Sequence, residues 1–387
     1  MPNKTLSLII VLAIATLVLG PGAVSPALAD IAKAFPDKSP ETIQMVATLP
    51  SLLFMVSSLV CGHLSRKLGK RTLVMTGLIL YGIGGIAPAF FGDLAFILVM
   101  RGVFGAGVGF IVPLSQALTA DYFAEPDRSV YMGYGSSTAS VFAMYFTMAG
   151  GYLCSIYWRY TFLSYLLVVP VFLLVMMKMP EPELQKPTVE HSRTSALTRR
   201  MWFYVTMYFL YNVIWMCFVT NAAFVMSVSK VGNANTIGLI MTISGFGGIV
   251  AGILLGWVTK VFKNFTLVLA VGFHALGFIM LLYVNSAIMF TLACAVFYFG
   301  FGIFNPAMSL KIIGSVPKSA ITLALAILTC AMGVGQFISP MVYSFINNNL
   351  GVEGPRASWV VAAVCFTATF MISLAKVALR PQKVEAA

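Results

Sequence analysis

GHLSRKLGKR, residues 62–71, is the most informative segment of the chain, because it concentrates charge in a sequence that is otherwise sparsely charged. It places five basic or ionisable side chains between two long apolar runs: His63, Arg66, Lys67, Lys70 and Arg71. Only 9% of the 387 residues are charged, and so dense a cluster is too costly to lie in hydrocarbon. The stretch therefore predicts a tight turn at a membrane surface between two membrane-spanning helices.

The composition indicates a membrane protein with little soluble mass. Hydrophobic residues make up 59% of the chain, whereas soluble domains are about half apolar and about a quarter charged. About 20 apolar residues span a bilayer as a helix, and these runs do not alternate in polarity as barrel strands do. The sequence predicts an all-α membrane protein with twelve transmembrane helices, near residues 6–28, 43–62, 72–91, 94–116, 130–152, 161–179, 201–227, 236–258, 265–284, 287–309, 320–346 and 358–379.

The positive charges divide unevenly between the two sides of the predicted membrane. With the N-terminus in the cytoplasm, eighteen of the 24 Lys and Arg residues fall inside and five outside, and Arg101 lies within a span. This asymmetry follows the positive-inside rule and predicts a multi-pass protein of the plasma (inner) membrane with both termini cytoplasmic. The net charge of +12 is then a result of topology, and we predict no nucleic-acid partner.

The two halves of the chain repeat each other. FGAG at residues 104–107 matches FGFG at 299–302, and MGYG at 132–135 matches MGVG at 332–335, at a nearly constant offset. The shared order of the matches indicates a duplicated unit of six helices in one orientation. A polar stretch with three prolines separates the copies. The predicted parts are a first six-helix bundle, a cytoplasmic linker and a second six-helix bundle, at residues 1–179, 180–200 and 201–387.

With these features the chain resembles the major facilitator superfamily over its whole length. Residues 62–71 match the family motif G-x-L-(D)-R-x-x-G-(R/K)-(R/K), with Ser65 in place of the usual aspartate. Arg101, followed by Gly105 and Gly109, is similar to a second family motif on the fourth span. The resemblance implies two bundles that open a central site alternately to either face of the membrane.

The resemblance also implies that the basic turn controls this opening. A pairing of Arg66 or Arg71 with Asp121, Glu125 or Asp127 would latch the cytoplasmic face, and plain anchoring by positive charge is the alternative. The predicted gating residues are Gly62, Ser65, Arg66, Gly69, Lys70, Arg71 and Asp121.

Arg101 is the one charged residue predicted to lie deep within a span. It would sit about 10 Å along its helix at 1.5 Å per residue, too deep to reach the membrane surface comfortably. One interpretation is a ligand for an anionic substrate or a part of a proton relay. The other is a structural clamp on carbonyl groups freed in the first helix, where Gly20-Pro21-Gly22 interrupts the hydrogen-bond ladder.

Polar and aromatic residues gather on one face of the helix predicted at residues 201–227. Four of them follow the i, i+3, i+4, i+7 spacing of a helix face, and two amides lie in later spans of the same half. We predict that these residues and Arg101 bind the substrate, and the alternative is that they join neighbouring helices. The set is Arg101, Tyr208, Tyr211, Asn212, Trp215, Asn305 and Gln336.

The acidic residues are informative because all twelve map to loops or to the ends of spans. A cavity without a buried carboxylate favours an organic anion or a small metabolite over an organic cation as the substrate. If protons drive transport, Asp30 and His274 are the candidate carriers. For His274, a hydrogen-bonded core histidine is the alternative.

The sequence thus predicts a secondary active transporter and not an enzyme. It has no P-loop, no H-E-x-x-H and no G-x-S-x-G, and its six cysteines are scattered singly, so we predict no cofactor and no metal. The predicted partners are a small-molecule substrate, the lipid bilayer and, if transport is coupled, protons, and the chain is predicted to be a monomer. The alternative function is a proton-coupled drug or metabolite efflux antiporter, whose G-P-x-x-G-G motif survives here only as Gly150-Gly151.

Overall fold

The computed structural model describes residues 4–65, 67–123, 127–181, 197–317, 320–351, 354 and 356–378, and no strand occurs among them. The first half contains α1 (Lys4–Ala15), η1 (Gly20–Ala27), α2 (Leu28–Ala34), α3 (Pro40–Leu64), α4 (Lys70–Ile86), η2 (Ala87–Ala89), α5 (Leu94–Tyr122), α6 (Asp127–Ile156), η3 (Trp158–Leu167) and α7 (Val168–Lys178). The second half contains α8 (Arg199–Val228), α9 (Ala234–Phe262), η5 (Lys263–Phe265), α10 (Thr266–Tyr283), α11 (Ala287–Ile313), α12 (Ile321–Leu350) and α13 (Ala357–Ala378).

The prediction of twelve membrane-spanning helices is confirmed, since twelve helices of the described residues are long and apolar enough to cross a membrane. The predicted ranges overlap all of them, but most of the helices run further at their ends. For example, α5 continues to Tyr122, whereas its predicted span ends at residue 116. Hydropathy detects only the apolar part of a helix, and the polar last turns stay helical beyond the hydrocarbon.

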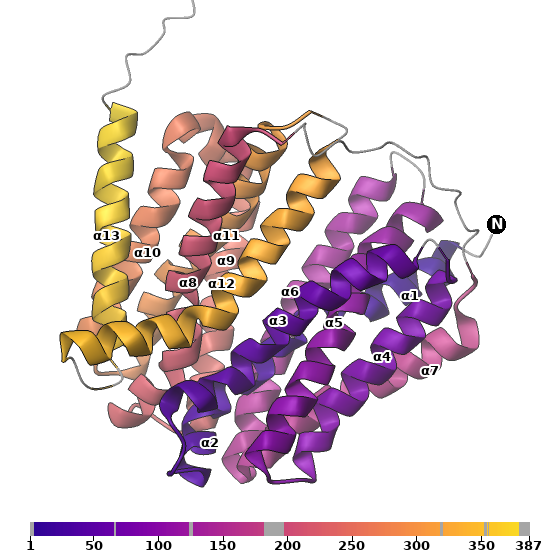
Figure 1. The fold of residues 1–387 in the computed structure, drawn as a ribbon, viewed down its shortest axis with the longest axis horizontal. Coiled ribbons are helices and arrows are strands. Elements are labelled where there is room, and N and C mark those ends of the chain that lie inside the picture. Colours follow the sequence, from indigo (N-terminus) through magenta and orange to yellow (C-terminus); the bar gives the residue numbers. More distant parts are fainter. Residues whose placement is uncertain are drawn as a thin grey trace, which may run out of the picture.

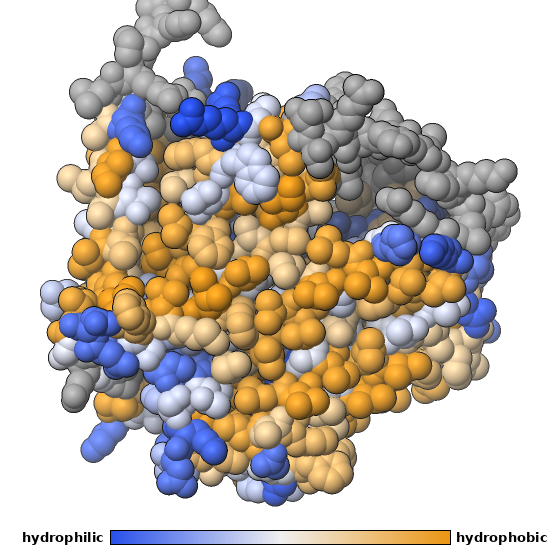
Figure 2. Space-filling view, in the orientation of Figure 1, coloured by the Kyte–Doolittle hydropathy of each residue, from blue (hydrophilic) through white to orange (hydrophobic). Residues whose placement is uncertain are grey.

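The helices form two bundles that lie side by side, with residues up to 181 in one and residues from 197 in the other (Figure 1). Figure 2 shows hydrophobic side chains across the middle of the visible face and hydrophilic ones toward its ends. This distribution suits a bilayer, where exposed side chains are apolar and backbone groups are paired within helices. Of the predicted linker, residues 182–196 lie outside the part of the chain that the structure describes.

The first membrane span is interrupted, and its α-helix ends before the predicted Gly20-Pro21-Gly22. Helix α1 ends at Ala15, residues 16–19 form a turn, and the 3-10 segment η1 then begins at Gly20 and contains Pro21 before α2 begins. The Thr161 hydroxyl lies 3.2 Å from the Ala23 carbonyl oxygen of η1 and 3.0 Å from the Gly150 carbonyl oxygen of α6. A carbonyl of the interrupted segment is therefore satisfied by a side chain of the same bundle.

Two helix pairs carry most of the interface between the bundles: α3 with α12, and α6 with α9. Helix α8 adds contacts with η1 and α2. We call the side of the molecule that carries residues 62–71 the basic-turn end, and the other side the opposite end. Gly151, near the end of α6, packs against the start of α9, and Gln44, near the start of α3, bonds to Asn221 of α8. These contacts close the interface at the opposite end.

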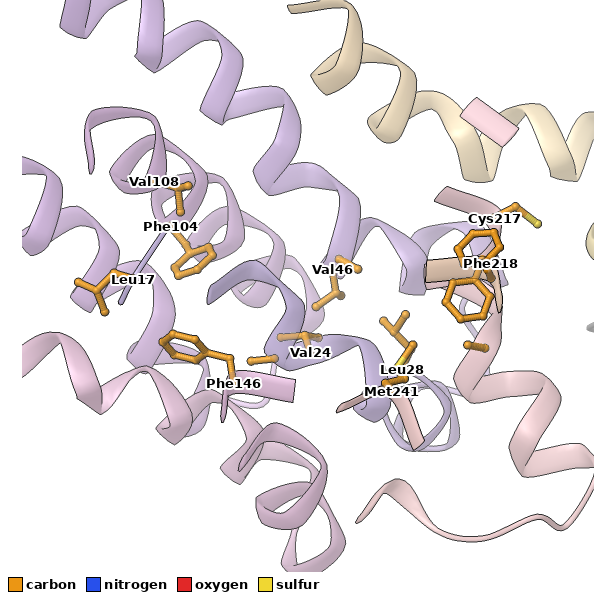
Figure 3. Packing of buried hydrophobic residues seen from close by; sticks show 14 of the residues in the cluster. Leu17, Val24, Leu28, Val46, Phe104, Val108, Phe146, Cys217, Phe218 and Met241 are labelled. Carbon is orange, nitrogen blue, oxygen red and sulfur yellow. The ribbon is translucent and has the colours of Figure 1, made fainter. Parts of the chain in front are cut away.

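The buried core is continuous between the bundles. Figure 3 shows Val24 and Leu28 of the first bundle in the same cluster as Phe218 and Met241 of the second. All four side chains are buried. Apolar packing therefore holds the bundles together, and the polar bonds described below occur at single points of the interface.

Candidate transport site between the bundles

Tyr208 and Asn305, two of the predicted substrate-binding residues, contact each other in the second bundle. The Tyr208 hydroxyl on α8 donates to Oδ1 of Asn305 on α11 at 2.5 Å, and Nδ2 of Asn305 donates to the Phe301 carbonyl at 3.2 Å. Sδ of Met332, on α12, lies 3.6 Å from the same hydroxyl. One small polar cluster thus connects α8, α11 and α12 within the membrane.

Asn212 and Gln336 form a hydrogen-bond chain that reaches the first bundle. Nε2 of Gln336 donates to Oδ1 of Asn212 at 3.2 Å, and the Ser51 hydroxyl donates to Oε1 of Gln336 at 3.0 Å. Asn212 is in turn fixed by its Nδ2, which donates to the Tyr208 carbonyl at 2.8 Å. Gln336 therefore bridges the bundles through uncharged groups alone.

Trp215 lies on the same face of α8 but packs among aromatic rings. Its indole is stacked on Phe301 with ring centroids 4.8 Å apart, and it also stacks on Phe297. Its Nε1 is buried and has no hydrogen-bond partner among the described residues. Since a buried indole N–H usually finds a partner, this donor is available to a ligand or a water molecule.

Tyr211 and His274 form a separate buried pair inside the second bundle. The Tyr211 hydroxyl lies 2.9 Å from Nε2 of His274, and Nδ1 of His274 lies 2.8 Å from the Ala270 carbonyl oxygen. A carbonyl oxygen only accepts, so Nδ1 carries a hydrogen; when the ring is neutral, Nε2 then accepts from the Tyr211 hydroxyl. Both ring nitrogens are occupied, as expected for a hydrogen-bonded core histidine.

Arg101 lies apart from the polar groups of α8. Its side chain is fully buried in the first bundle, where Nε donates to the Val46 carbonyl at 2.8 Å and Nη1 donates to the Tyr165 hydroxyl at 3.1 Å. The guanidinium carbon lies 4.3 Å from the ring centroid of Phe104, a cation–π distance. The carbonyl that it binds belongs to α3, and not to the first span as the clamp interpretation expected.

Asp30 lies at the opposite end of the molecule, on α2. Its carboxylate accepts from Nζ of Lys33 at 2.8 Å, and the Cys154 thiol lies 3.7 Å from its other oxygen. Its side chain is about one third exposed (32%), so Asp30 is accessible to solvent, whereas His274 is fully buried. The structure does not bring these two candidate proton carriers together.

The basic turn is tied to other parts of the first bundle. Lys70, at the start of α4, forms an ion pair with Asp121, at the end of α5. The amide of Arg71 donates to the Glu181 carboxylate at 3.2 Å, and its guanidinium donates to the Met176 carbonyl at 2.5 Å. The start of α4 and the end of α7 therefore satisfy each other's free backbone groups.

The small residues among the predicted gating positions lie within or beside this turn. The Ser65 hydroxyl lies 3.0 Å from the Gly62 carbonyl oxygen. Gly69 directly precedes α4 and lies against the Glu181 carboxylate. These residues therefore shape the turn that brings Lys70 and Arg71 to their partners.

The structure shows a lysine partner for Asp121 and does not test the predicted latch. Asp121 pairs with Lys70, because α4 begins beside the end of α5, and a pairing of Arg66 or Arg71 with the acidic residues in one conformational state stays a prediction. Arg66, Glu125 and the side chain of Asp127, which the latch also invoked, lie outside the part of the chain that the structure describes.

We expect Lys70→Met to destabilise the first bundle by about 1.5–3 kcal/mol, the range for a hydrogen bond to a charged group. The Asp121 side chain is 9% exposed, and the variant leaves its carboxylate without this partner. Lys67→Met is the matched control, because Lys67 is exposed in the same turn. Thermal unfolding in detergent measures both, and equal shifts for the two variants would show that the ion pair contributes nothing specific.

Sequence reasoning missed the two residues that connect the predicted site to the first bundle. Ser51 reaches Gln336, and Gln44 donates from Nε2 to Oδ1 of Asn221 at 3.2 Å. Both are polar residues within an apolar run, and Ser51 follows Gln44 by about two helical turns. That spacing puts them on one face of α3, and this shared polar face is the sequence feature that could have identified them.

Comparison with known proteins identifies the family. The chain matches the family model of the Major Facilitator Superfamily over residues 8–340, with a second match over residues 218–386. The chain belongs to the Major Facilitator Superfamily. Its twelve spans in two bundles are the arrangement that the resemblance implied.

Solved structures of other transporters share the fold of this superfamily member. The nucleoside transporter NupG superposes with a TM-score of 0.79 at 13% identity, covering 96% of this chain and 98% of that one. A D-xylose–proton symporter superposes with a TM-score of 0.71 at 15% identity, covering 96% of this chain and 97% of that one. At such identities the likeness concerns the fold alone.

Curated relatives match parts of the chain. An uncharacterized transporter of Rickettsia bellii is 26% identical over 232 residues, which are 57% of this chain and 56% of that protein. The methyl viologen resistance protein SmvA of Salmonella typhimurium is 30% identical over 128 residues, 33% of this chain and 25% of that protein. The chain thus spans about half the length of the first relative and a quarter of the second.

Proposed function

We propose that this protein is a secondary active transporter that moves a small, uncharged, polar metabolite by alternating access. One observation carries the proposal: the groups that join the bundles at the predicted site are the hydroxyl of Ser51 and the amides of Gln336 and Asn212. Hydroxyls and amides offer both donors and acceptors, so they suit a polar solute without a formal charge.

The organic-anion alternative depends on Arg101, whose contacts favour the uncharged substrate instead. Its Nε and Nη1 are already bonded, to Val46 and Tyr165, and its side chain has no exposed surface. Only Nη2 has no partner among the described residues, and this nitrogen is buried as well. An anion would have to enter the first bundle and separate its packed groups before it could pair with the guanidinium. The amides lie at the interface between the bundles, so a solute would replace bonds that they make there and would not have to enter the core of one bundle.

Counterflow into proteoliposomes tests the substrate class. Vesicles that contain the purified protein are loaded in turn with uncharged solutes (sugars, polyols, nucleosides), organic acids and organic cations, and exchange of the labelled solute is followed. We expect saturable exchange of an uncharged solute, and we expect Asn305→Ala to weaken its binding. Saturable exchange of organic acids alone would contradict the proposal and restore the anion alternative.

A second candidate function is efflux of drugs or metabolites in exchange for protons. It is favoured by the likeness to a methyl viologen resistance protein and opposed by the loss of the Gly-Pro pair before Gly150. Resistance to cationic dyes, conferred on a sensitive host by the wild-type chain, would support this second function over the first.

For coupling, we propose Asp30 as the candidate proton carrier to test first, because its carboxylate is partly exposed and next to Lys33. His274 is the second candidate, although both of its nitrogens are bonded. A pH-sensitive dye inside proteoliposomes reports proton movement during transport. Loss of the proton signal in Asp30→Asn with retained solute counterflow would support the assignment.

For the topology, we propose a monomer in the plasma membrane with both termini and the linker in the cytoplasm. The orientation rests on the excess of Lys and Arg on that side. Labelling of single cysteines with membrane-impermeant reagents tests it. Cysteines placed in residues 62–71 and 180–200 should react from the same face of the membrane.

A further inference from the structure

Helix α3 contains a proline in the middle of the membrane, and this proline leaves one backbone carbonyl of the helix without its usual hydrogen-bond donor. Pro50 lies within α3 and has no amide hydrogen. In an unbroken helix that hydrogen would bond to the carbonyl four residues earlier, which is the carbonyl of Val46. In hydrocarbon such a carbonyl cannot turn to water, so another part of the protein has to supply a donor.

Arg101 supplies this donor. Its Nε donates to the Val46 carbonyl at 2.8 Å, which replaces the bond that Pro50 cannot make. The guanidinium is held in place by the Tyr165 hydroxyl and by the ring of Phe104. The donor is therefore fixed in position by two further contacts within the first bundle.

The glycine one turn after Arg101 fits the same purpose. A Cβ at Gly105 would collide with the Pro50 carbonyl oxygen, so a larger residue would push α3 away from α5. Arg101 and Gly105 are one helical turn apart on α5, and Val46 and Pro50 are one turn apart on α3. The two helices thus run in register, with the arginine opposite the freed carbonyl and the glycine opposite the proline that frees it.

The residue after the proline connects this arrangement to the second bundle. Ser51 donates to Oε1 of Gln336 at 3.0 Å, and Gln336 donates to Asn212. We infer that Arg101 is a positioning residue: by replacing the hydrogen bond that Pro50 lacks, it fixes the segment of α3 that presents Ser51 to Gln336. It acts on transport through α3 and does not contact the substrate.

A double-mutant cycle between Arg101 and Pro50 tests this inference. Pro50→Ala restores the amide hydrogen, so that residue 50 can bond to the Val46 carbonyl within the helix. In the wild-type background, we expect Arg101→Met to lower both the thermal unfolding temperature and turnover, the latter by about tenfold, the factor for one unmet buried carbonyl. In the Pro50→Ala background, we expect the same change to have less than half of each effect.

Arg356→Met is the matched control, because Arg356 also binds main-chain carbonyls, those of Leu282 and Val284, far from Pro50 along the chain. Its effect should be the same in both backgrounds. The inference rests on the proposed function only for the turnover readout, since unfolding temperatures decide the cycle even if no substrate is found. Equal losses for Arg101→Met in both backgrounds, in unfolding temperature or in turnover, would overturn it and point to direct binding of a substrate or proton.

Discussion

Gly151→Leu is expected to abolish transport, because it prevents the bundles from meeting at the opposite end. A Cβ at Gly151 would lie 2.5 Å from the Ala234 carbonyl oxygen and 3.0 Å from the Gly238 Cα, both on α9. These are backbone atoms, so no side chain can move aside to make room. The variant should still fold, since each bundle also packs around buried side chains of its own away from this contact, but its α6 and α9 should be forced apart.

Gly133→Leu is the matched control on the same helix. Apart from its own stretch of helix, no described residue has an atom within 4 Å of the position that a Cβ at Gly133 would take, so the added side chain meets open space there. Single cysteines at each end of the molecule, labelled with a thiol reagent, report which end is open. Gly151→Leu should raise labelling at the opposite end, and Gly133→Leu should leave it at the wild-type value. Wild-type labelling and transport in Gly151→Leu would show that the close approach of α6 and α9 is not required.

The spans were predictable from the sequence because hydrocarbon imposes a long apolar run on each of them. The break in the first span was predictable for an equally local reason, since Pro21 and its flanking glycines cannot continue a helix. The contact of Arg101 was not predictable, because its partner is a backbone carbonyl, which the sequence does not mark. Only Pro50 indicates that this carbonyl is free, and the proline belongs to a different helix.

The residues proposed for the candidate site could be chosen from the sequence, but the hydrogen bonds between them could not. The helical spacing on α8 identified Tyr208 and Asn212, since the repeat of the α-helix alone decides which residues share a face. The bond from Gln336 to Ser51 depends on how two bundles meet, which is a property of the packed interface and not of either helix. The same holds at the basic turn, where the charge pattern identified the cluster, but only the packing of α4 against α5 selects the lysine that pairs with the α5 aspartate.

Gln336→Leu is expected to reduce transport at least about tenfold, because it removes the residue that bridges the bundles at the site. Leucine has a similar size but no polar atoms, so the Ser51 hydroxyl and the Oδ1 of Asn212 lose the partners they have at 3.0 and 3.2 Å. An unmet buried group costs about 1–3 kcal/mol, and here buried Asn212 and half-buried Ser51 both lose their partner in one change. The free energy of the conformation in which the bundles are joined here should rise by that amount, so this conformation should become less populated.

Gln116→Leu is the control for the same chemical change at an exposed position, on α5. Counterflow rates and thermal unfolding of the two variants separate a local effect from a general effect of adding an apolar side chain. The double variant Ser51→Ala, Gln336→Leu tests for rescue. Ser51→Ala removes the hydroxyl, which is one of the two groups that Gln336→Leu leaves without a partner. If the bridge stabilises the joined bundles, the double variant should unfold at a higher temperature than Gln336→Leu alone. If Gln336 instead acts only by touching the solute, Ser51→Ala should leave the unfolding temperature of Gln336→Leu unchanged or lower it, which would remove Ser51 from the site.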